Sequence, residues 1–425
     1  ADGAIKATVC SRARNLQSVG GIVGCAGGTQ ITVQECTNYA DLTIETEVGN
    51  YIGGINGATE VSAVYENCVN YGNILCTGRL NGAGCVSTSG TARFGEAADA
   101  SLQCVNYGNI TFGGTAASTF AGGILGYSSR PVEIYACVNE GDIGSKTAAE
   151  GKVVGASGIA GSVYTMAGPS VIADCVQKGE IWQVFINGVR DDGWIWADTA
   201  SYGTGGILGY SYAPMTITNC VNGIAAGDSA GSIHGIDGAG LIGGIVGHAK
   251  SGGSLTMLSC INYADITGEG RMLYAGGLVG AGRNVTLGSR EGAVLPCANY
   301  GDVTAQGELR YGGGLFGAAS AAVTIGSEAD ASCITVNYGD VYGRGAENYV
   351  GGIAGNLGGT IAVYYCENQG NVALGNSTLS YVGGIAGCVG TNQKVMLSHC
   401  VNETAVAAAG TAADVGTRSA VGGIA

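Results

Sequence analysis

The main concentration of side chains suited to ligand chemistry lies in one insertion, residues 182–204, which holds all three tryptophans of the chain. Indole rings beside carboxylates and a guanidinium can stack on sugar rings or anchor a protein partner. The same side chains can instead pack on the flank of the molecule, and the sequence leaves both alternatives open. We therefore take as the ligand or lattice contact Trp182, Arg190, Asp191, Asp192, Trp194 and Trp196.

Catalytic arrangements are missing from the rest of the sequence. His234, His248 and His399 lie in unrelated segments, and none belongs to a His-Glu-x-x-His metallopeptidase motif. Gly-x-Ser-x-Gly does not occur as the strand-to-helix elbow of a hydrolase. Cys and His spacing fits no zinc site, so the sequence predicts no metal and no cofactor. We expect no enzyme; a polysaccharide-active enzyme using Asp191 and Asp192 is the third alternative.

These side chains must be positioned by one repeat, which occurs about eleven times with a period of about 36 residues. Its first part is a glycine pair followed by apolar residues, as at 205–209 and 351–355. Its second part reads Cys-x-Asn-Tyr-Gly-Asp-Ile or a close variant, as at 104–110 and 297–303. Each unit of such a repeat buries its apolar face only against its neighbours. Residues 1–425 are therefore predicted to form a single array.

Within one repeat the pattern predicts strands. Residues 29–36 and 41–46 alternate apolar and polar side chains and are rich in β-branched residues, with turn-forming Asn and Gly between them. No segment has sustained helical periodicity. The sequence predicts an all-β protein: a parallel β-solenoid (β-helix) of about eleven repeats, with about three short strands each and no significant helix. A β-propeller is the rival fold, but propellers usually close with about four to eight blades.

Two residue types recur at a fixed phase of the repeat. In a solenoid the cysteines form one inward file, where a free thiol packs as a small apolar group. The asparagines two residues later bond their own turn and the turns above and below. We expect a structural ladder made of Cys36, Cys68, Cys104, Cys137, Cys175, Cys220, Cys260, Cys297, Cys366, Cys400, Asn38, Asn70, Asn106, Asn262, Asn299 and Asn337. The cysteines outside this phase are the better disulfide candidates: Cys10, Cys25, Cys76, Cys85, Cys333 and Cys388.

Acidic turn residues recur as well, and asparagines take the same phase in other repeats. Stacked carboxylates can hold calcium between coils, but the Gly-Gly-x-Gly-x-Asp repeat of calcium-binding rolls is absent. We therefore interpret this file as a solvated edge, formed by Asp41, Asp142, Asp265, Asp302 and Asp340.

Composition limits the partners. The net charge is −14, from 18 Lys and Arg against 32 Asp and Glu, so nucleic acid is not expected as a partner. No apolar stretch approaches the length that crosses a membrane, so membrane insertion is not expected. Charged residues make up only 12% of the chain, and a surface so poor in charge is weakly protected against self-association.

The repeat resembles a known family. The glycine motifs at 243–247 and 276–280, with the Cys-x-Asn motifs at 260–266 and 297–303, are similar to the GLUG-type repeats of large microbial surface proteins. These proteins include adhesins and the non-catalytic regions of bacterial immunoglobulin A peptidases. The resemblance covers nearly the whole chain. It implies an extracellular or cell-surface β-rich stalk or adhesive region, and it transfers no catalytic residue.

The two ends of the chain indicate how copies could join. Residues 5–10 resemble the Cys-bearing strand, and residues 421–425 stop inside a glycine motif, so the two half-repeats nearly make one whole. One explanation is that the chain is a piece of a longer repeat protein. The other is head-to-tail stacking of subunits through assembly edges at Ile5, Thr8, Cys10, Val421, Gly422, Gly423 and Ile424.

The sequence thus predicts a non-catalytic extracellular structural protein of a cell-surface layer, sheath or fibre. Its expected partner is itself, in a head-to-tail oligomer or filament. The alternative is an adhesin or glycan-binding stalk of a larger surface protein, with a surface glycan or a host protein as partner.

Overall fold

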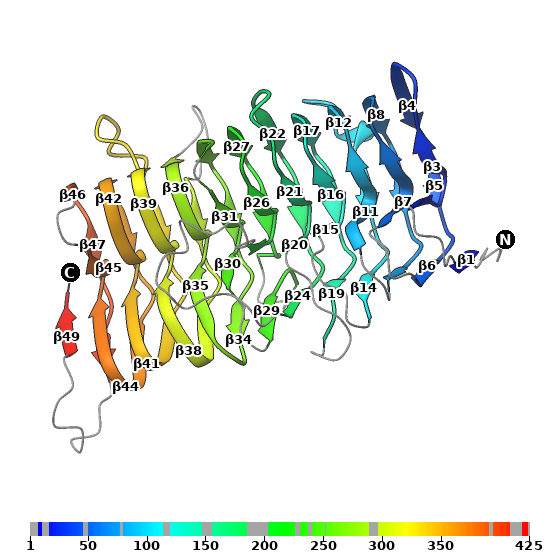
Figure 1. Ribbon diagram of the computed structural model, residues 1–425. Helices are drawn as coiled ribbons and strands as arrows, with labels where there is room; N and C mark the ends of the chain where they lie inside the picture. The colour runs from blue at the N-terminus through cyan, green and yellow to red at the C-terminus, as the bar shows by residue number, and fades with distance from the viewer. Residues whose placement is uncertain are drawn as a thin grey trace.

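The repeat folds into one elongated stack of strands. The computed structural model describes residues 7–10, 17–45, 50–76, 80–113, 120–146, 155–184, 203–225, 230–236, 240–250, 252–288, 296–390, 394–408 and 419–423. Coil follows coil from β1 at the N-terminal end to β49 at the C-terminal end (Figure 1). Strands of successive coils pair in parallel and form one 38-stranded and one 11-stranded sheet. The predicted parallel β-solenoid is confirmed.

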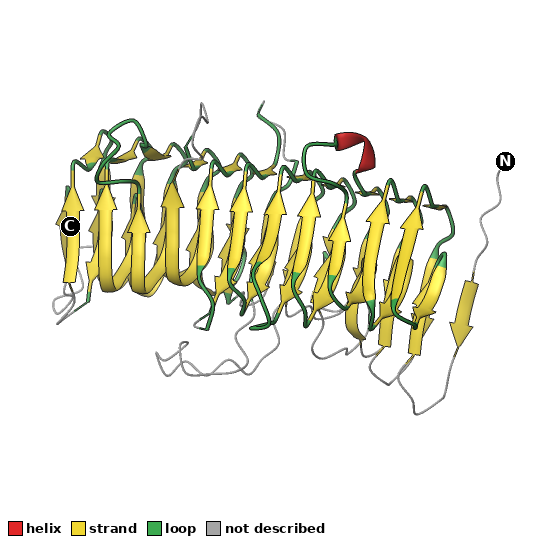
Figure 2. Ribbon diagram, turned by 90° about the horizontal axis from the view of Figure 1, so that it is seen from above, coloured by secondary structure: helices red, strands yellow, loops and turns green. Residues whose placement is uncertain are grey.

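Helix is nearly absent from the described residues. A single 3-10 turn, η1 (Ala100–Leu102), stands out from the rows of parallel arrows when the stack is seen from above (Figure 2). Apart from this turn, parallel strands of successive coils follow one another along the described stack. Strand pairing between coils therefore builds the molecule.

Each coil contributes to five strand columns, which we call A to E in chain order. Column A follows the Asn-Tyr-Gly-Asp turn, column B leads into the glycine pair, column C follows the pair, column D leads to the Cys, and column E carries the Asn. Columns A to D belong to the 38-stranded sheet, and column E is the 11-stranded sheet. The expectation of about three strands per repeat is therefore too low. Column E was missed because its strands, such as β9 (Val69–Asn70), are only two or three residues long.

Columns A and B hold the strands on either side of the loop that precedes the glycine pair. Column A contains β1 (Ala7–Cys10), β6 (Leu42–Glu45), β10 (Ile74–Cys76), β14 (Ile110–Phe112), β19 (Ile143–Gly144), β24 (Ile181–Val184), β29 (Ile233–Ile236), β34 (Ile266–Gly268), the starts of β38 (Val303–Gly313), β41 (Val341–Gly351) and β44 (Val372–Gly383), and β48 (Val406–Ala408). Column B contains β2 (Gln17–Gly20), the starts of β7 (Asn50–Thr59) and β11 (Leu80–Ser89), β15 (Phe120–Gly122), β20 (Gly155–Ser157), β25 (Thr204–Gly205), β30 (Leu241–Gly243), β35 (Met272–Gly276), the ends of β38, β41 and β44, and β49 (Ser419–Gly422).

Columns C, D and E complete the coil. Column C contains β3 (Val23–Ala26), the ends of β7 and β11, β16 (Leu125–Ser128), β21 (Ala160–Val163), β26 (Leu208–Ser211), β31 (Val246–Ala249), the starts of β36 (Val279–Gly288), β39 (Phe316–Ile325) and β42 (Ala354–Tyr364), and β45 (Ala386–Val389). Column D contains β4 (Gln30–Gln34), β8 (Ser62–Glu66), β12 (Ala92–Phe94), β17 (Val132–Tyr135), β22 (Ser170–Ala173), β27 (Met215–Thr218), β32 (Leu255–Leu258), the ends of β36, β39 and β42, and β46 (Lys394–Ser398). Column E contains β5 (Thr37–Asn38), β9, β13 (Val105–Asn106), β18 (Val138–Asn139), β23 (Val176–Gln177), β28 (Val221–Asn222), β33 (Ile261–Asn262), β37 (Ala298–Asn299), β40 (Thr335–Asn337), β43 (Cys366–Asn368) and β47 (Val401–Asn402).

The cross-section has two large hydrophobic cores that meet at a waist, and a smaller third cluster, which includes Leu241 and Tyr274, lies between strands of columns B and C. One core lies between columns C and D and includes the inward cysteines, as at Met257, Cys260 and Leu278. The other lies between columns A and B, as at Ile266 and Ala275. Because each core continues from coil to coil, apolar burial holds the stack together along its length.

The waist explains why the glycine pair and the Asn recur together. The second glycine of each pair lies against the Asn side chain of the same coil. A Cβ on Gly277 would come within 2.2 Å of Cγ of Asn299, which is fully buried. In the coils that carry this second glycine, a side chain there would collide with the Asn, so the two halves of the repeat motif meet in space.

A sharp corner joins columns D and E. The residue before the inward Cys has a positive φ in most coils, as at Asp174 (+57°), Ser259 (+55°) and Tyr365 (+49°). L-residues adopt this left-handed region at a cost. The corner turns the chain so that the following cysteine lies in the core.

Candidate functional site

Trp182 is the member of the predicted ligand contact that the structure describes. It lies in column A, half-buried, and its ring stacks on His234 of the next coil with centroids 4.0 Å apart. Lys146 of the preceding coil lies 5.2 Å from the ring centroid, and the indole Nε1 donates a hydrogen bond to Glu180 Oε2 at 3.2 Å. Both neighbouring coils thus contact the indole, so Trp182 packs within the stack and offers little ring face to a sugar.

The other members of that contact are not placed. Arg190, Asp191, Asp192, Trp194 and Trp196 lie outside the described residues. The ligand interpretation of these remaining side chains stays a prediction.

The three histidines are spread over the molecule. His234 Nδ1 lies 2.9 Å from Thr267 Oγ1, and burial lowers the pKa of its imidazole although Glu180 opposes that shift. His248 lies in column C against the ring of Tyr210, and His399 stacks on Tyr365 at the corner between columns D and E. Among the described residues no group of three or more His, Cys, Asp or Glu could hold a metal ion.

A buried ladder of side-chain amides runs along the waist. Most of these Asn donate one Nδ2 hydrogen bond to a carbonyl two residues ahead, as from Asn262 to Ala264, and the other to Oδ1 of the Asn in the next coil. For Asn222 the bond to the next coil is the one seen among the described residues. These links measure 2.7–2.8 Å between Asn38, Asn70, Asn106 and Asn139, and 2.8 Å between Asn222, Asn262, Asn299, Asn337, Asn368 and Asn402. The ladder has a direction, because every link donates toward the C-terminal end.

The ladder changes at the degenerate repeat. Asn139 donates to Gln177 Oε1 at 2.7 Å, but Gln177 donates to the carbonyl of Gly179 and makes no bond to Asn222. Oδ1 of Asn222 is buried without a partner among the described residues. The extra methylene of glutamine therefore interrupts the amide chain in the repeat that carries the long insertion.

The cysteine file lies in the core between columns C and D. Its members are buried except Cys36 and Cys400, which lie half-buried in the outermost described coils. The thiols donate to backbone carbonyls of the preceding coil, as from Cys68 to Val33 at 3.3 Å. Burial raises the pKa of the Cys175 thiol well above its usual value. The file thus packs as small apolar groups with satisfied S–H donors.

The off-phase cysteines do not form disulfides in the described part of the chain. No disulfide joins any two of Cys25, Cys76, Cys85, Cys333 and Cys388 there, so the structure does not support pairing among these five within one chain. Cys76, Cys85 and Cys333 are buried, where a thiol packs as a small apolar group. Cys388 is half-buried and Cys25 is exposed.

The acidic file also connects coils. Asp265 Oδ1 accepts the backbone N–H of Asp302 at 2.8 Å, and Asp302 Oδ1 accepts that of Asp340 at 2.7 Å. Asn109 does the same for Asp142 at 2.9 Å. Asp and Asn interchange at this phase because both supply an Oδ1 acceptor. Burial raises the pKa of the Asp302 carboxyl, and the carboxylates of Asp265 and Asp340 add to that shift against the hydrogen bond from Asp340.

A file of stacked tyrosines was missed by sequence reasoning. Tyr39, Tyr71 and Tyr107 stack at 5.0 and 4.8 Å, and Tyr263, Tyr300 and Tyr338 stack at 4.9 and 4.5 Å. The Lys178–Glu140 ion pair, 2.7 Å, lies at the same phase between these two groups. The Tyr of the Cys-x-Asn-Tyr-Gly motif was the available signal, since equal spacing in a solenoid places equal side chains one above another.

The predicted assembly edges need a correction. Thr8 and Cys10 lie in β1, which pairs with β6 in column A, as in Thr8 with Thr43. The described residues of this segment, 7–10, therefore do not occupy the phase of the Cys-bearing strand, which is column D. Val421 and Gly422 lie in β49 of column B, and Gly423 follows in a bend. The two ends consequently repeat columns A and B rather than supply two missing halves, while Ile5 and Ile424 lie outside the described residues.

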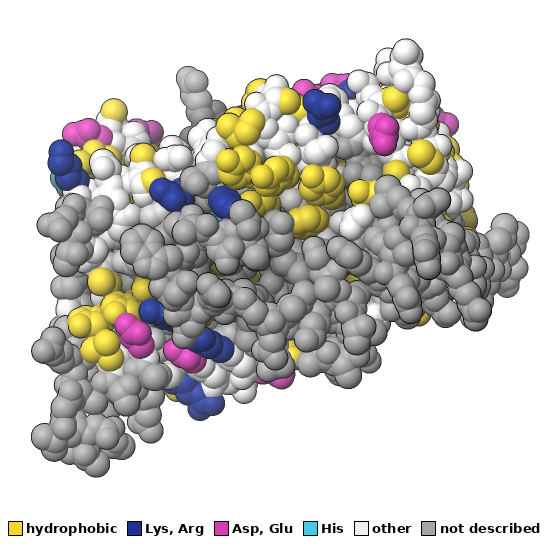
Figure 3. Space-filling model, viewed as in Figure 1, with side chains coloured by type: hydrophobic (Ala, Val, Ile, Leu, Met, Phe, Trp, Pro, Cys, Tyr) yellow, Lys and Arg dark blue, Asp and Glu magenta, His cyan; other side chains and the backbone are white. Residues whose placement is uncertain are grey.

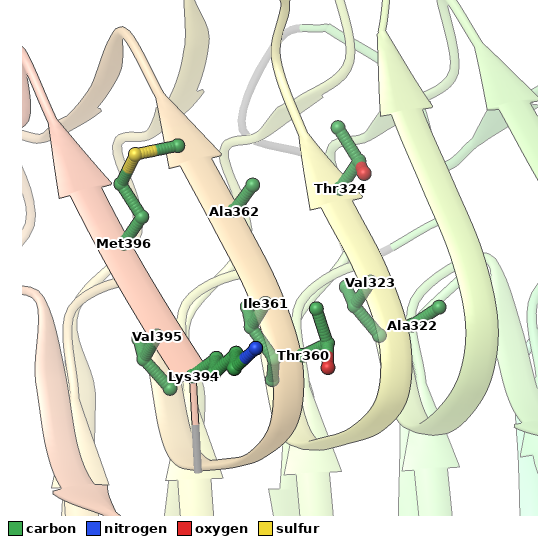
Figure 4. A pocket seen from close by; sticks show the side chains of 9 residues that line it. All are labelled: Ala322, Val323, Thr324, Thr360, Ile361, Ala362, Lys394, Val395 and Met396. Atoms are coloured by element: carbon green, nitrogen blue, oxygen red, sulfur yellow. The ribbon is translucent and has the colours of Figure 1, made fainter.

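A shallow pocket lies on the outer face of column D near the C-terminal end. Ala322, Thr324, Ala362, Lys394 and Met396 line it together with other residues of β39, β42 and β46, and it encloses ≈ 330 Å³ (Figure 4). Lys394 is its single titratable side chain. Small apolar and hydroxyl groups on an open face do not supply a general acid and a base together.

The chain matches no protein-family model, no curated protein and no solved structure. In the part of the chain that the structure describes, no helix is long and apolar enough to cross a membrane.

Proposed function

We propose that this chain is a non-catalytic structural protein of an extracellular layer, sheath or fibre, in which copies stack coil upon coil. The directional amide ladder carries this proposal. Among the described residues, Nδ2 of Asn402 donates to the carbonyl of Thr404 and has a second hydrogen to give, and Oδ1 of Asn38 accepts the backbone N–H of Ala40 and can accept one bond more. The C-terminal edge of one copy is thus complementary to the N-terminal edge of another.

The surface supports the same proposal. In the part of the face that Figure 3 draws in colour, Lys, Arg, Asp and Glu side chains stand as separate groups among uncharged side chains, as expected for a chain with 12% charged residues. The outermost described coils also expose apolar side chains, including Ile22 at one end and Val401 at the other. Exposed strand edges with few charges favour pairing with another strand.

Electron microscopy and sedimentation of the 425-residue polypeptide test the proposal. We expect rods that lengthen with concentration in steps of about 50–55 Å, from eleven coils of about 4.8 Å. Asn402→Asp keeps the acceptor oxygens but removes the outward donor, and it should raise the concentration needed for assembly. Asn284→Asp makes the same change of charge at an exposed position of β36, inside the stack, and should leave assembly as it is.

Two outcomes would redirect the proposal. Single rods of about 55 Å at every concentration would exclude stacking of this polypeptide. Binding to a glycan array that is lost with Trp194→Ala would favour the adhesin or glycan-binding stalk.

A further inference from the structure

The two outermost strand pairs occupy the same place in the coil. β1 and β2 lie in columns A and B at one end of the stack, and β48 and β49 lie in columns A and B at the other. Columns A and B therefore each contain one strand more than the 11-stranded column E. If β5 of one copy stacks on β47 of another, then β1–β2 of the first and β48–β49 of the second compete for one position beside β6–β7.

The competing strands carry equivalent sequences. β2 and the following residues read Gln-Ser-Val-Gly-Gly-Ile, and β49 and the following residues read Ser-Ala-Val-Gly-Gly-Ile. Val19 and Gly20 pair with Ile52 and Gly53 of β7. β49 thus presents Val and Gly in the same order, and it has the glycine that this column needs, because a Cβ on Gly20 would collide with backbone.

From this duplication we propose strand exchange between copies: β48–β49 of one copy replace β1–β2 of the next. In a single copy, β1–β2 cover the edge formed by β6–β7. In the assembly, that cover is displaced and the solenoid continues without a dislocation. The inference rests on the proposed stacking. It adds the register in which two copies meet, and it identifies β1–β2 as the strands that are displaced.

Two cysteines mark the register independently. Cys25 of β3 and Cys388 of β45 hold the same position of column C, at its first and last strands, since pairing runs from Cys25 to Ala58 and on through Asn356 to Cys388. Strand exchange brings Cys388 of one copy beside Cys25 of the next, with Cα atoms about 4.8 Å apart. That separation lies within the range of a disulfide.

Oxidised glutathione can convert this contact into a covalent link. The two protein thiols lose two protons and two electrons and form one S–S bond. Glutathione disulfide takes up the two electrons and the two protons and leaves as two thiols. The proposed disulfide therefore reports the head-to-tail contact without being required for it.

Two matched substitutions test the exchange in the full chain. Val19→Asp weakens the cover and should lower the concentration needed for assembly on the order of tenfold. Val421→Asp changes the equivalent strand of the donor and should raise that concentration by a similar factor. Thermal unfolding by circular dichroism establishes that both variants fold.

Opposite effects of the two variants on the concentration needed for assembly support strand exchange. Equal effects would overturn strand exchange, and sedimentation would still show whether the copies stack. Absence of any assembly by the unsubstituted chain would instead overturn the stacking proposal.

Oxidation gives the second readout. With glutathione disulfide, the unsubstituted chain should give covalent ladders on non-reducing gels, and Cys25→Ser or Cys388→Ser alone should remove them. A mixture of the two variants should give covalent dimers and nothing larger, because each supplies one cysteine of the pair. Ladders that persist in either variant would contradict the register.

Discussion

Gln177 leaves Oδ1 of Asn222, in the next coil, without a hydrogen-bond donor among the described residues, because its own amide bonds the carbonyl of Gly179. In other coils an asparagine makes both bonds. Gln177→Asn should therefore restore the ladder and raise the free energy of unfolding by about 1–2 kcal/mol, measured by urea denaturation.

The reverse change provides the control. Asn262→Gln inserts a methylene into an intact part of the ladder and should lower the free energy of unfolding by a similar amount or more. If Gln177→Asn lowers the free energy of unfolding as well, the space in the waist at this coil fits glutamine better than asparagine. The missing hydrogen bond to Asn222 would then not be what limits the stability of this repeat.

Gln183 is a second polar group that the fold leaves unsatisfied. Its side chain is fully buried, and neither Oε1 nor Nε2 has a partner within the described part of the chain. Gln183→Met keeps the length and removes the desolvated amide, so the free energy of unfolding should rise by about 1–3 kcal/mol. Gln183→Glu is the matched control and should lower it, since it buries a charge. A loss of stability in Gln183→Met would show that buried water satisfies the amide.

The corner between columns D and E provides a backbone test. Ala136 has φ +53°, which glycine adopts without strain. Ala136→Gly should raise the free energy of unfolding by up to about 1 kcal/mol, the left-handed penalty less the added entropy of the unfolded chain. Ala298→Gly, in strand β37, should lower it by about as much. Destabilisation by both substitutions would mean that the Ala136 methyl group contributes more by packing than its backbone conformation costs.

The repeat made the architecture predictable, and the same regularity hid local detail. Cys260 and Asn262 recur with the period, so their inward files followed from spacing and burial alone. The contact between Gly277 and Asn299 could not be predicted from spacing, because the two motifs meet at a waist that only the folded cross-section defines.

Residues 5–10 were assigned the wrong phase for a physical reason: short alternating strands look alike, and the turns that distinguish column A from column D lie outside the strand. For Trp182 the sequence leaves ligand contact and packing both open, because it does not show which ring faces the neighbouring coils cover. The stacked tyrosines were not predicted, because their ring contacts depend on the register of successive coils and the side chains themselves carry no reactive group.

Asp302 tests the electrostatics of the acidic file. Burial and the flanking carboxylates of Asp265 and Asp340 raise the pKa of Asp302 above its ordinary value, so the folded state holds the proton more tightly than the unfolded state. The stabilisation that comes with this proton is present below the ordinary Asp pKa and is lost as the pH rises through the raised value.

Asp302→Asn keeps the Oδ1 acceptor for the N–H of Asp340, as Asn109 does for Asp142, and removes the charge. At pH 7 it should raise the free energy of unfolding by about 0.5 kcal/mol after solvent screening, with a smaller gain at pH 4 and in high salt. Asp41→Asn is the control, because Asp41 bonds the N–H of Asn73 and has no carboxylate at the next position of the file. A gain for Asp302→Asn that is independent of pH and salt would assign the effect to packing instead of charge.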